Sequence, residues 1–499
     1  MASDCVSPTE SARPDAAAER APLFRRPRSV AAVPVVFLGL GLYRAWIEIV
    51  FVGTFVVFPA ATVSARDLFD WTMVVTALGC TLLARRIGPF FDKRWPFVLG
   101  SAMLVASTTL MFASCWVASL AAWAGYAAAV AGGFGIALVI LTWSELYGCL
   151  NPLRVALYYS ASIVAGAVVL YVYRGFMLPW LFVMTALLPP LSFWAASRGF
   201  AHLPPQERPA TAWTRFSVPW KAVPWKAVLF MAAYAFGYGL MENGMYGGVF
   251  GPHSAPGAVL VAVLVFVGVS FQGGRFDFSL IYRFALPLIV AALFLVPVFG
   301  GTQNYAAGFC MAAAYTAQSI LIMLICANIC YRYGVSAIWL FGIERGVRQI
   351  FMWLGRVTAA GVGALESFGI GGEVAVSALA VVAVALATAV LLSERDLSSR
   401  WGANFLSGGT DSAAMIRKQE LADRCDEIAR TYKLSAREEE VLLLLAQRKT
   451  VGSIERELLI ANGTAKAHVR HIYQKLDIHT RQELFDLLGL DGRETGPQD

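Results

Sequence analysis

The chain has 499 residues, of which 58% are hydrophobic and only 15% charged, and its mean hydropathy is +0.61. A soluble protein of this length would not need so much apolar side chain, because a single hydrophobic core stops growing well below this size. The composition therefore excludes an ordinary soluble protein and indicates a membrane protein, with a modest net charge of +7, much of which flanks apolar segments.

Residues 1–30 are rich in Ala, Pro, Ser and charge and end in the basic sequence FRRPR, so we expect a disordered basic tail. A secretory signal would need a short apolar core and a cleavage site of small residues. Here the first apolar segment continues to Pro59 and more apolar segments follow, which predicts a retained first span.

Residues 31–393 are predicted to form a polytopic membrane domain. A span needs ~20 apolar residues, and this criterion predicts about twelve spans in two halves of six, on either side of a long loop from Arg198 to Lys226. The predicted spans are centred near Leu40, Thr76, Ser107, Gly133, Val164, Leu187, Tyr234, Leu264, Ile289, Ala314, Leu354 and Ala383. The eleventh carries Glu344, Arg345, Arg348 and Arg356, so we expect part of it to lie at the membrane interface or to face a protein-lined cavity.

Lys and Arg gather in alternate connections, including the N-terminal tail, the loop from Arg85 to Arg94 and the long central loop. This bias predicts a multi-pass protein of the cytoplasmic (inner) membrane, with both termini in the cytoplasm and the lipid bilayer as a partner. Six plus six spans around a long loop resemble the major facilitator superfamily in architecture, although the loop from Arg85 to Arg94 matches the sequence motif of that family poorly.

Charges inside the predicted spans are expensive unless they are paired or functional. Arg44 and Glu48 are four residues apart in the first span, where they can neutralise each other, and Glu242 and Asn243 end the Gly-rich sequence FGYGLMEN in the seventh. One interpretation is a ligand or ion site between the halves, since the first and seventh spans would be equivalent. The other interpretation is structural: an intrahelical ion pair of Arg44 and Glu48 in the first span, and a Glu242 near a water-exposed end. We prefer the structural interpretation for Arg44 and Glu48. For Glu242 both interpretations stay open.

Eight cysteines are scattered, mostly inside apolar runs, and we expect them to be small core residues without a metal site. After the last span, residues 394–431 are predicted to form a Gly/Ser-rich linker and a charged helix from about Ala413 to Arg430, which could extend or dimerise the last domain. No cofactor-binding Gly-rich loop is found.

Residues 432–491 are predicted to form four short helices. The first starts with a capping box of Ser435 and Glu438, and Thr450 is a candidate cap for the second. The last starts with a second capping box, Thr480 and Glu483. The apolar positions expected to face the core are Val441, Leu444, Leu445, Ile454, Leu458, Val469, Ile472, Leu476, Leu484, Leu487 and Leu488.

The third of these helices, from about Thr464 to Lys475, is basic on its outer face. That face carries Lys466, Arg470, His471 and Lys475, and no acidic residue occurs from Thr464 to Leu476. Two helices joined by a short turn, the second basic in its N-terminal half, have the geometry to place side chains against base edges in the major groove of DNA. A small helical bundle that docks a partner protein is the alternative.

This stretch resembles the DNA-binding module of the LuxR family of bacterial transcription regulators. The resemblance rests on LSAREEEVLLLLA (434–446), IERELLI (454–460) and TAKAHVRHIYQKLDIHTR (464–481). It implies that Lys466, Ala467 and Arg470 face bases, while Thr464, His468, Lys475 and Arg481 lie nearer the phosphates or hold the helix in place. The chain departs from the family at Arg448, where a turn Gly is usual, at Val451, Ser453 and Glu455 in the second helix, at Ala461 in place of a Ser cap, and at Ala465 in place of Val.

Taken together, the sequence predicts an all-α, membrane-anchored one-component transcription regulator. Its membrane domain would sense a small molecule or the state of the membrane, and its C-terminal domain would bind double-stranded DNA, with a homodimer formed through that domain as a further candidate interaction. The alternative is a transporter of a small solute with a regulatory cytoplasmic tail. An enzyme is not expected, because His202, His253, His468, His471 and His479 show no catalytic or metal-ligand spacing.

Overall fold

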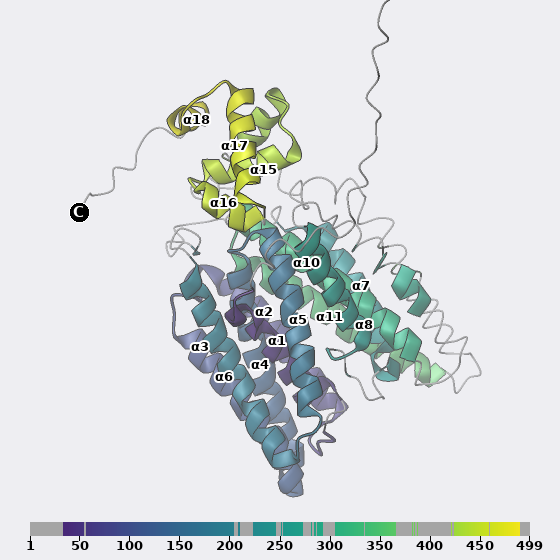
Figure 1. Ribbon diagram of the computed structural model, residues 1–499. Helices are drawn as coiled ribbons and strands as arrows, with labels where there is room; N and C mark the ends of the chain where they lie inside the picture. Colours follow the sequence, from purple (N-terminus) through teal and green to yellow (C-terminus); the bar gives the residue numbers. More distant parts are fainter. Residues whose placement is uncertain are drawn as a thin grey trace, which may run out of the picture.

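The computed structural model of the chain describes residues 33–53, 56–203, 208–209, 223–245, 251, 253–272, 281, 284–285, 287–292, 305–333, 335–365, 382, 384, 387, 421, 424–458 and 460–489. Every regular element in these ranges is a helix, which confirms the all-α prediction. Figure 1 shows a bundle of long helices with a small domain of short helices on one of its ends.

The first half of the bundle coincides with the six spans predicted from Leu40 to Leu187. Its long helices are α1 (Leu40–Ile47), α2 (Val63–Ile87), α3 (Trp95–Trp116), α4 (Ala121–Tyr147), α5 (Pro152–Tyr173) and α6 (Leu178–His202). Short turns of other helix types precede α1 (η1, Val35–Gly39), follow it (η2, Glu48–Val52) and precede α4 (η3, Ala118–Leu120). The π-helical turn η2 extends α1 and carries Glu48.

The second half contains α7 (Trp225–Met245), α8 (Pro256–Gln272), α10 (Tyr305–Tyr333) and α11 (Ala337–Leu365). These helices hold the spans predicted at Tyr234, Leu264, Ala314 and Leu354. The span at Ile289 falls in a stretch that is described only in part, and the one at Ala383 lies mostly outside the described residues, so the count of twelve stays a prediction. Within the described residues, seven helical segments are long and apolar enough to cross a bilayer.

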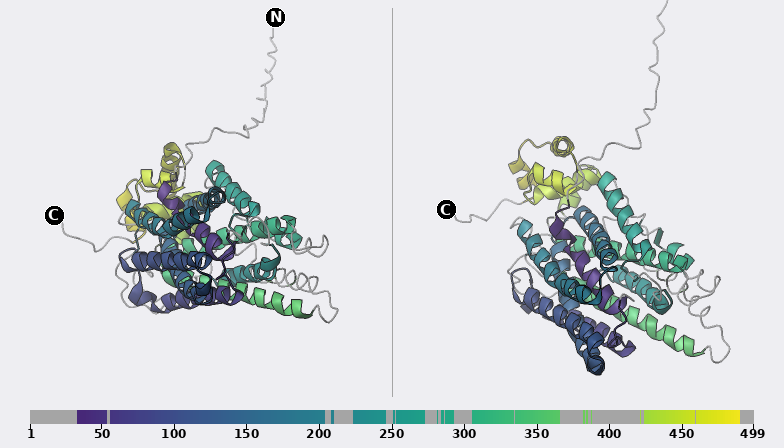
Figure 2. Two further views of the ribbon diagram at one scale, coloured as in Figure 1. Left: turned by 90° about the horizontal axis from the view of Figure 1, so that it is seen from below. Right: turned by 60° about the horizontal axis from the view of Figure 1, so that its bottom comes forward.

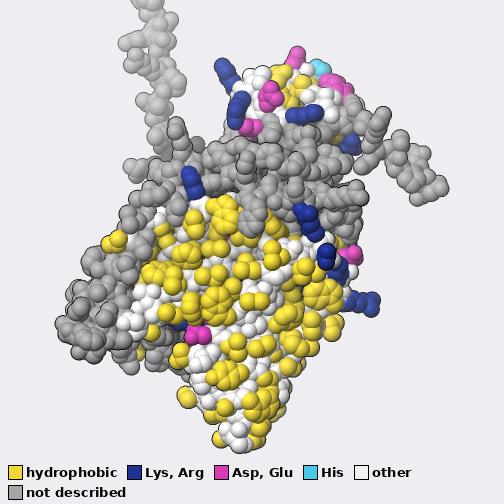
Figure 3. Space-filling model, turned by 180° about the vertical axis from the view of Figure 1, so that it is seen from behind, with side chains coloured by type: hydrophobic (Ala, Val, Ile, Leu, Met, Phe, Trp, Pro, Cys, Tyr) yellow, Lys and Arg dark blue, Asp and Glu magenta, His cyan; other side chains and the backbone are white. Residues whose placement is uncertain are grey.

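Lipid-facing composition is visible on the outside of the bundle. Figure 3 shows a broad surface of hydrophobic side chains with few charges below the small domain. Large apolar side chains exposed on the helices of the bundle include Leu82, Trp123, Val168, Trp180 and Leu264. A water-soluble protein rarely exposes such an area, whereas a helix in hydrocarbon requires it. The chain is therefore a multi-pass membrane protein.

Two pairs of helices approach closely at glycine. A Cβ on Gly41 of α1 would lie 2.2 Å from the carbonyl oxygen of Ser162 in α5, and one on Gly239 of α7 would lie 2.1 Å from the carbonyl oxygen of Met352 in α11. Small residues allow this backbone contact between membrane helices. The two pairs occupy equivalent positions in the predicted halves, which supports an internal repeat. Between the halves, α2 packs on α11 and α5 packs on α8.

The small domain contains the four predicted helices, α15 (Ala436–Ala446), α16 (Val451–Leu458), α17 (Asn462–Leu476) and α18 (Arg481–Leu487). The right-hand view of Figure 2 shows it beyond the end of the long helices. The predicted apolar positions are buried or half-buried with one exception. Leu487 is 41% exposed, so that prediction was wrong. Phe485 is buried instead, and the Arg448 guanidinium lies over its ring.

The core of this domain begins before residue 432. Residues 424–431 are helical, and Cys425 and Ala429 are buried, with Cys425 in the same cluster as Val441 and Leu488. The Arg424 Nη1 also donates a 2.6 Å hydrogen bond to the carbonyl of Leu488. The charged helix predicted in the linker therefore packs on the four-helix core and extends it, at least over these residues.

Candidate functional site

The basic face of α17 is exposed in the small domain. Lys466, Arg470 and His471 are exposed, whereas Thr464, Ala467 and His468 are half-buried. Lys466 and Arg470 line a surface hollow of about 510 Å³. The other residues of this hollow are Val451, Val469, Tyr473, Gln474, Asp477, Ile478 and His479. Two cations therefore point into a concave surface between the start of α16 and the outer face of α17.

Lys475 and Arg481, by contrast, hold the domain together. The Lys475 Nζ lies 2.7 Å from a carboxylate oxygen of Glu438 in α15. The Arg481 Nη2 donates to the carbonyl of Lys449 (2.9 Å), and its guanidinium stacks on the ring of Phe485. Of the two roles that the resemblance implied for them, phosphate contact or positioning of the recognition helix, the observed contacts are those of positioning.

The electrostatics of the domain follow from these contacts. Burial raises the pKa of Glu438, but the hydrogen bond from Lys475 and the capping bonds with Ser435 outweigh it and hold the pKa at about 2. The capping box predicted for α15 is thereby confirmed. Burial, followed by the charge of Arg437, lowers the pKa of His468 and so disfavours the charged form of this imidazole.

The departures from the family pattern have structural counterparts. Arg448 adopts a φ of 61°, the left-handed conformation for which glycine is favoured, and its guanidinium lies 4.9 Å from the ring centre of Phe485. Glu455 accepts a 2.6 Å hydrogen bond from the Asn462 side chain across the turn between α16 and α17. Ala461 is the N-cap of α17 and offers no side-chain hydrogen bond.

The other caps agree with the sequence in most respects. Thr450 accepts from the amide of Ser453 (3.3 Å) at the start of α16, as predicted. Thr480 caps α18 by accepting from the amide of Glu483, but the Glu483 carboxylate reaches the amide of His479 instead of the N-cap amide. The second capping box is therefore formed only in its first half.

The small domain rests on the bundle through the turn before α16. The Lys449 Nζ donates a 2.8 Å hydrogen bond to the Tyr331 hydroxyl at the end of α10 and lies 5.1 Å from the centre of its ring. The helix α16 also contacts α5. Sequence reasoning missed this contact, because residues 118 positions apart leave no local signal.

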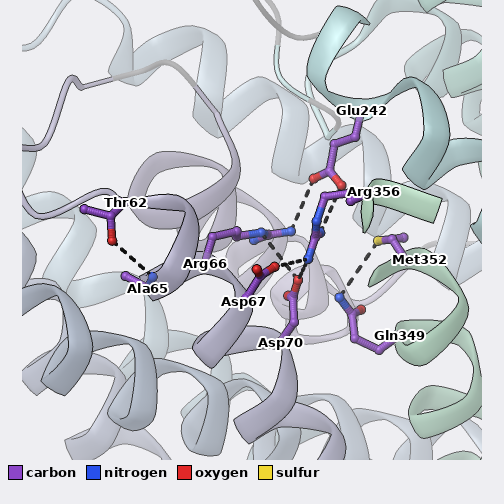
Figure 4. Close-up of polar contacts among 9 residues, drawn as sticks. All are labelled: Thr62, Ala65, Arg66, Asp67, Asp70, Glu242, Gln349, Met352 and Arg356. Carbon is purple, nitrogen blue, oxygen red and sulfur yellow. Dashed lines mark hydrogen bonds and ion pairs between the residues drawn. The ribbon is translucent and has the colours of Figure 1, made fainter. Parts of the chain in front are cut away.

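Glu242 belongs to an ion network that joins the two halves of the bundle (Figure 4). Its carboxylate lies 3.0 Å from the Arg356 guanidinium of α11 and 3.3 Å from the Arg66 guanidinium of α2. Arg356 also pairs with Asp70 and with Asp67, both of α2. Glu242 is therefore neutralised within the protein. The side chain of Asn243 lies outside the described residues.

The ion pair expected between Arg44 and Glu48 is not formed. Glu48 accepts from the backbone amides of His253 (2.6 Å) and Ser254 (2.9 Å), just before α8, and from the Ser254 hydroxyl. The reason is the set of donors before α8, which binds the Glu48 carboxylate although Glu48 keeps its helical spacing from Arg44. The structure thus separates these two charges and buries both.

The eleventh span faces protein instead of the membrane interface. Glu344 and Arg348 are buried within α11, and α11 packs against α7 and α2. Of the two alternatives open for this segment, the described contacts favour the protein-facing one.

Comparison with known proteins agrees with both parts. Residues 432–488 match the family GerE, described as bacterial regulatory proteins, luxR family. A bacterial homologue of the iron transporter ferroportin, in an outward-facing state, superposes with a TM-score of 0.50 at 10% identity, over 73% of this chain and 98% of that one. FucP, a major facilitator superfamily transporter, gives a TM-score of 0.45 at 12% identity, over 72% and 97% of the two chains.

No curated protein sequence matches the chain. At such low identity the structural similarity establishes the fold alone. The chain therefore joins a membrane domain, similar in fold to a bacterial homologue of the iron transporter ferroportin, to a C-terminal domain that matches the luxR family of bacterial regulatory proteins.

Proposed function

We propose that the protein is a membrane-anchored one-component transcription regulator, in which the membrane domain senses a signal and controls DNA binding by the C-terminal domain. The observation that carries this proposal is the contact of Lys449 with Tyr331, because it connects a LuxR-type domain directly to a membrane helix. The basic connections lie on one side of the predicted spans, which supports a cytoplasmic position for the domain in the inner membrane.

Docking would compete with DNA. Lys449 and α16 face the bundle, and α16 begins at Val451, which lines the same hollow as Lys466 and Arg470. A duplex entering that hollow would meet the ends of α5 and α10. We therefore expect the signal to act on the equilibrium between a docked and a released domain, and the linker of residues 394–431 to set how far the released domain reaches.

DNA binding is tested with the full chain in lipid nanodiscs, using duplexes selected from a random library and fluorescence anisotropy. Lys466→Ala and Arg470→Ala are each expected to weaken binding by about 1–3 kcal/mol, and affinity should fall steeply with salt because phosphate contacts release counterions. Arg430→Ala, whose side chain is 79% exposed on the preceding helix, is the charge-matched control and should bind as the wild type does. Wild-type affinity in both α17 variants would refute the assignment of the recognition helix.

Control by docking is tested on the same nanodiscs. Tyr331→Ala removes both the hydrogen bond and the ring that hold Lys449, so it should raise the DNA affinity of the full chain. A separate fragment of residues 413–499 does not contain Tyr331. Its DNA affinity should therefore be the same when it is mixed with nanodiscs of the wild type or of Tyr331→Ala. Equal DNA affinity of wild type and Tyr331→Ala would contradict docking as the control point.

A second candidate function is transport of a small solute, with the C-terminal domain as a regulatory tail. The observation that favours it is the transporter-like fold of the membrane domain. Proteoliposomes that contain the chain would then accumulate or release a labelled solute, and Glu242→Gln would abolish this flux by weakening the network between the halves. A panel of solutes without any flux would leave the regulator as the supported function.

A further inference from the structure

A second group of charges, distinct from the network around Glu242, lies where α1, α5, α10 and α11 meet. Three of its members are guanidinium groups, Arg44 of α1 and Arg345 and Arg348 of α11. Among the described residues, Glu344 of α11 is the carboxylate that pairs with Arg345 and Arg348. Their exposure is low: 7% for Arg44, 4% for Arg348 and 1% for Glu344. The cluster therefore combines three buried or nearly buried cations with one anion.

The two buried groups differ in their charge balance. Around Glu242, two arginines face the three carboxylates of Glu242, Asp70 and Asp67. Around Glu344, positive charge is in excess, although the group lies inside a membrane helix bundle. A buried charge without a partner is strongly destabilising, and inside membrane proteins such charges mark binding sites. The excess therefore calls for a negatively charged occupant.

Unused hydrogen-bond donors occur at the same place. The Arg348 Nε donates to Glu344 (2.7 Å) and its Nη1 donates to the Ser319 hydroxyl of α10 (3.2 Å). Within the described part of the chain, however, the buried Arg44 Nε has no hydrogen-bond partner, and the Arg345 Nε, 3.3 Å from Glu344, is not aligned for a hydrogen bond. Buried donors of this kind are rare unless a ligand or an ion uses them.

Tyrosines from the other helices surround the three cations. Tyr159 of α5 lies within electrostatic range of all three guanidinium groups, and its hydroxyl is 3.2 Å from the hydroxyl of Ser319. Tyr43 of α1 lies within range of the same three groups. Phenol hydroxyls can donate to an oxyanion, whereas they give no charge to balance the arginines. The site thus offers donors from both halves of the bundle.

We propose that Arg44, Arg345 and Arg348 bind the oxyanion of a small molecule, a carboxylate or a phosphate, between the two halves of the membrane domain. Planar guanidinium groups suit such groups, because they donate paired hydrogen bonds to two oxygens. The carboxylate or phosphate balances the excess positive charge and bridges α1 to α11. Glu344 keeps Arg348 oriented and is a positioning residue.

Such binding has a direct route to the docked domain, an extension that rests on the proposed function. The helix α10 carries Ser319, which bonds to Arg348, and about three turns later it carries Tyr331, which bonds to Lys449. An anion that draws α1 and α11 together moves the neighbours of α10. A shift of the end of α10 would then alter the contact between Tyr331 and Lys449, which holds the DNA-binding domain.

The binding test uses the full chain in lipid nanodiscs and no DNA. Inorganic phosphate and benzoate are titrated separately at an ionic strength held constant with KCl, and the thermal midpoint is followed by tryptophan fluorescence. At least one of the two anions should raise the midpoint with saturation. Arg44→Gln and Arg345→Gln should each weaken this response at least tenfold, and without anion each should melt higher than the wild type, because an unbalanced buried charge has been removed.

Two controls separate binding from general effects of charge or folding. Arg198→Gln removes one positive charge from the exposed end of α6, where the guanidinium stacks on Trp194, and should respond to anions as the wild type does. Arg44→Lys keeps the charge and should retain a weaker but saturable response. No saturable shift with either anion, or an unchanged response in Arg44→Gln, would overturn the proposal; neither result would touch the DNA-binding test.

Discussion

Ala461 shows how a single position limits the stability of the recognition helix. It is the N-cap of α17 but makes no side-chain hydrogen bond, so an amide in the first turn lacks a local partner. Ala461→Ser should therefore stabilise the domain by about 1 kcal/mol. The measurement is urea unfolding of residues 413–499, which have their own hydrophobic core. Thr450→Ala removes an existing cap from α16 and should shift the midpoint in the opposite direction.

Glu438 makes the same domain sensitive to acid. Its pKa is lowered to about 2 from an ordinary value of 4.5, so the folded state favours the ionised carboxylate. Its stabilising contribution is therefore complete above about pH 4.5 and is lost as the pH falls towards 2. In urea unfolding at a series of pH values, Glu438→Gln should flatten this part of the profile. A profile identical to that of the wild type would show that the pair with Lys475 contributes nothing.

Among the elements, the connection between α2 and α3 is fixed by the end of α4. Glu145 of α4 accepts from the amides of Phe90 (2.9 Å) and Phe91 (3.0 Å), and the Lys93 Nζ donates to the carbonyls of Ile87 (2.7 Å) and Gly88 (3.0 Å) at the end of α2. The basic loop from Arg85 to Arg94, which matches the family motif poorly, therefore includes a residue, Lys93, that caps the end of α2.

Removal of the Glu145 carboxylate tests this element. Glu145→Ala leaves two amides without an acceptor, which should cost about 1–3 kcal/mol, and Glu145→Gln, which keeps one acceptor, should cost less. The measurement is thermal unfolding of the full chain in detergent. Asp92→Ala, a change at an exposed neighbour in the same connection, is the control and should leave the midpoint unchanged. Equal midpoints for all three variants would argue against the proposed clamp.

On the scale of the whole molecule, the network around Arg356 fastens one half of the bundle to the other. Loss of one partner from a buried ion pair is far more costly than replacement of both by apolar residues. Glu242→Leu alone should therefore reduce the free energy of unfolding by about 3–5 kcal/mol and lower the thermal midpoint accordingly. The double variant Glu242→Leu, Arg356→Met should recover part of the lost stability. Additive losses in the double variant would show that the two side chains do not interact.

The sequence by itself determined the helices and their caps. Long apolar runs predicted the spans, and apolar periodicity predicted the inward positions of the C-terminal domain. Capping acts within one turn, so Ser435 and Thr450 were correctly assigned. The exposed basic face of α17 also follows from local spacing. Leu487 was misplaced, because the competition between neighbouring side chains for one core position is not local.

Only the tertiary structure decided which charges meet. Glu48 lies 205 positions from its backbone partner at His253, Arg66 lies 176 from Glu242, and Tyr331 lies 118 from Lys449. Spacing along a helix suggested Arg44 as the partner of Glu48, but donors at His253 and Ser254 bind that carboxylate instead. In the low dielectric of the bundle, a buried charge is stabilised by the partner that the fold brings next to it. The Nε donors of Arg44 and Arg345 are buried, and no described residue satisfies them.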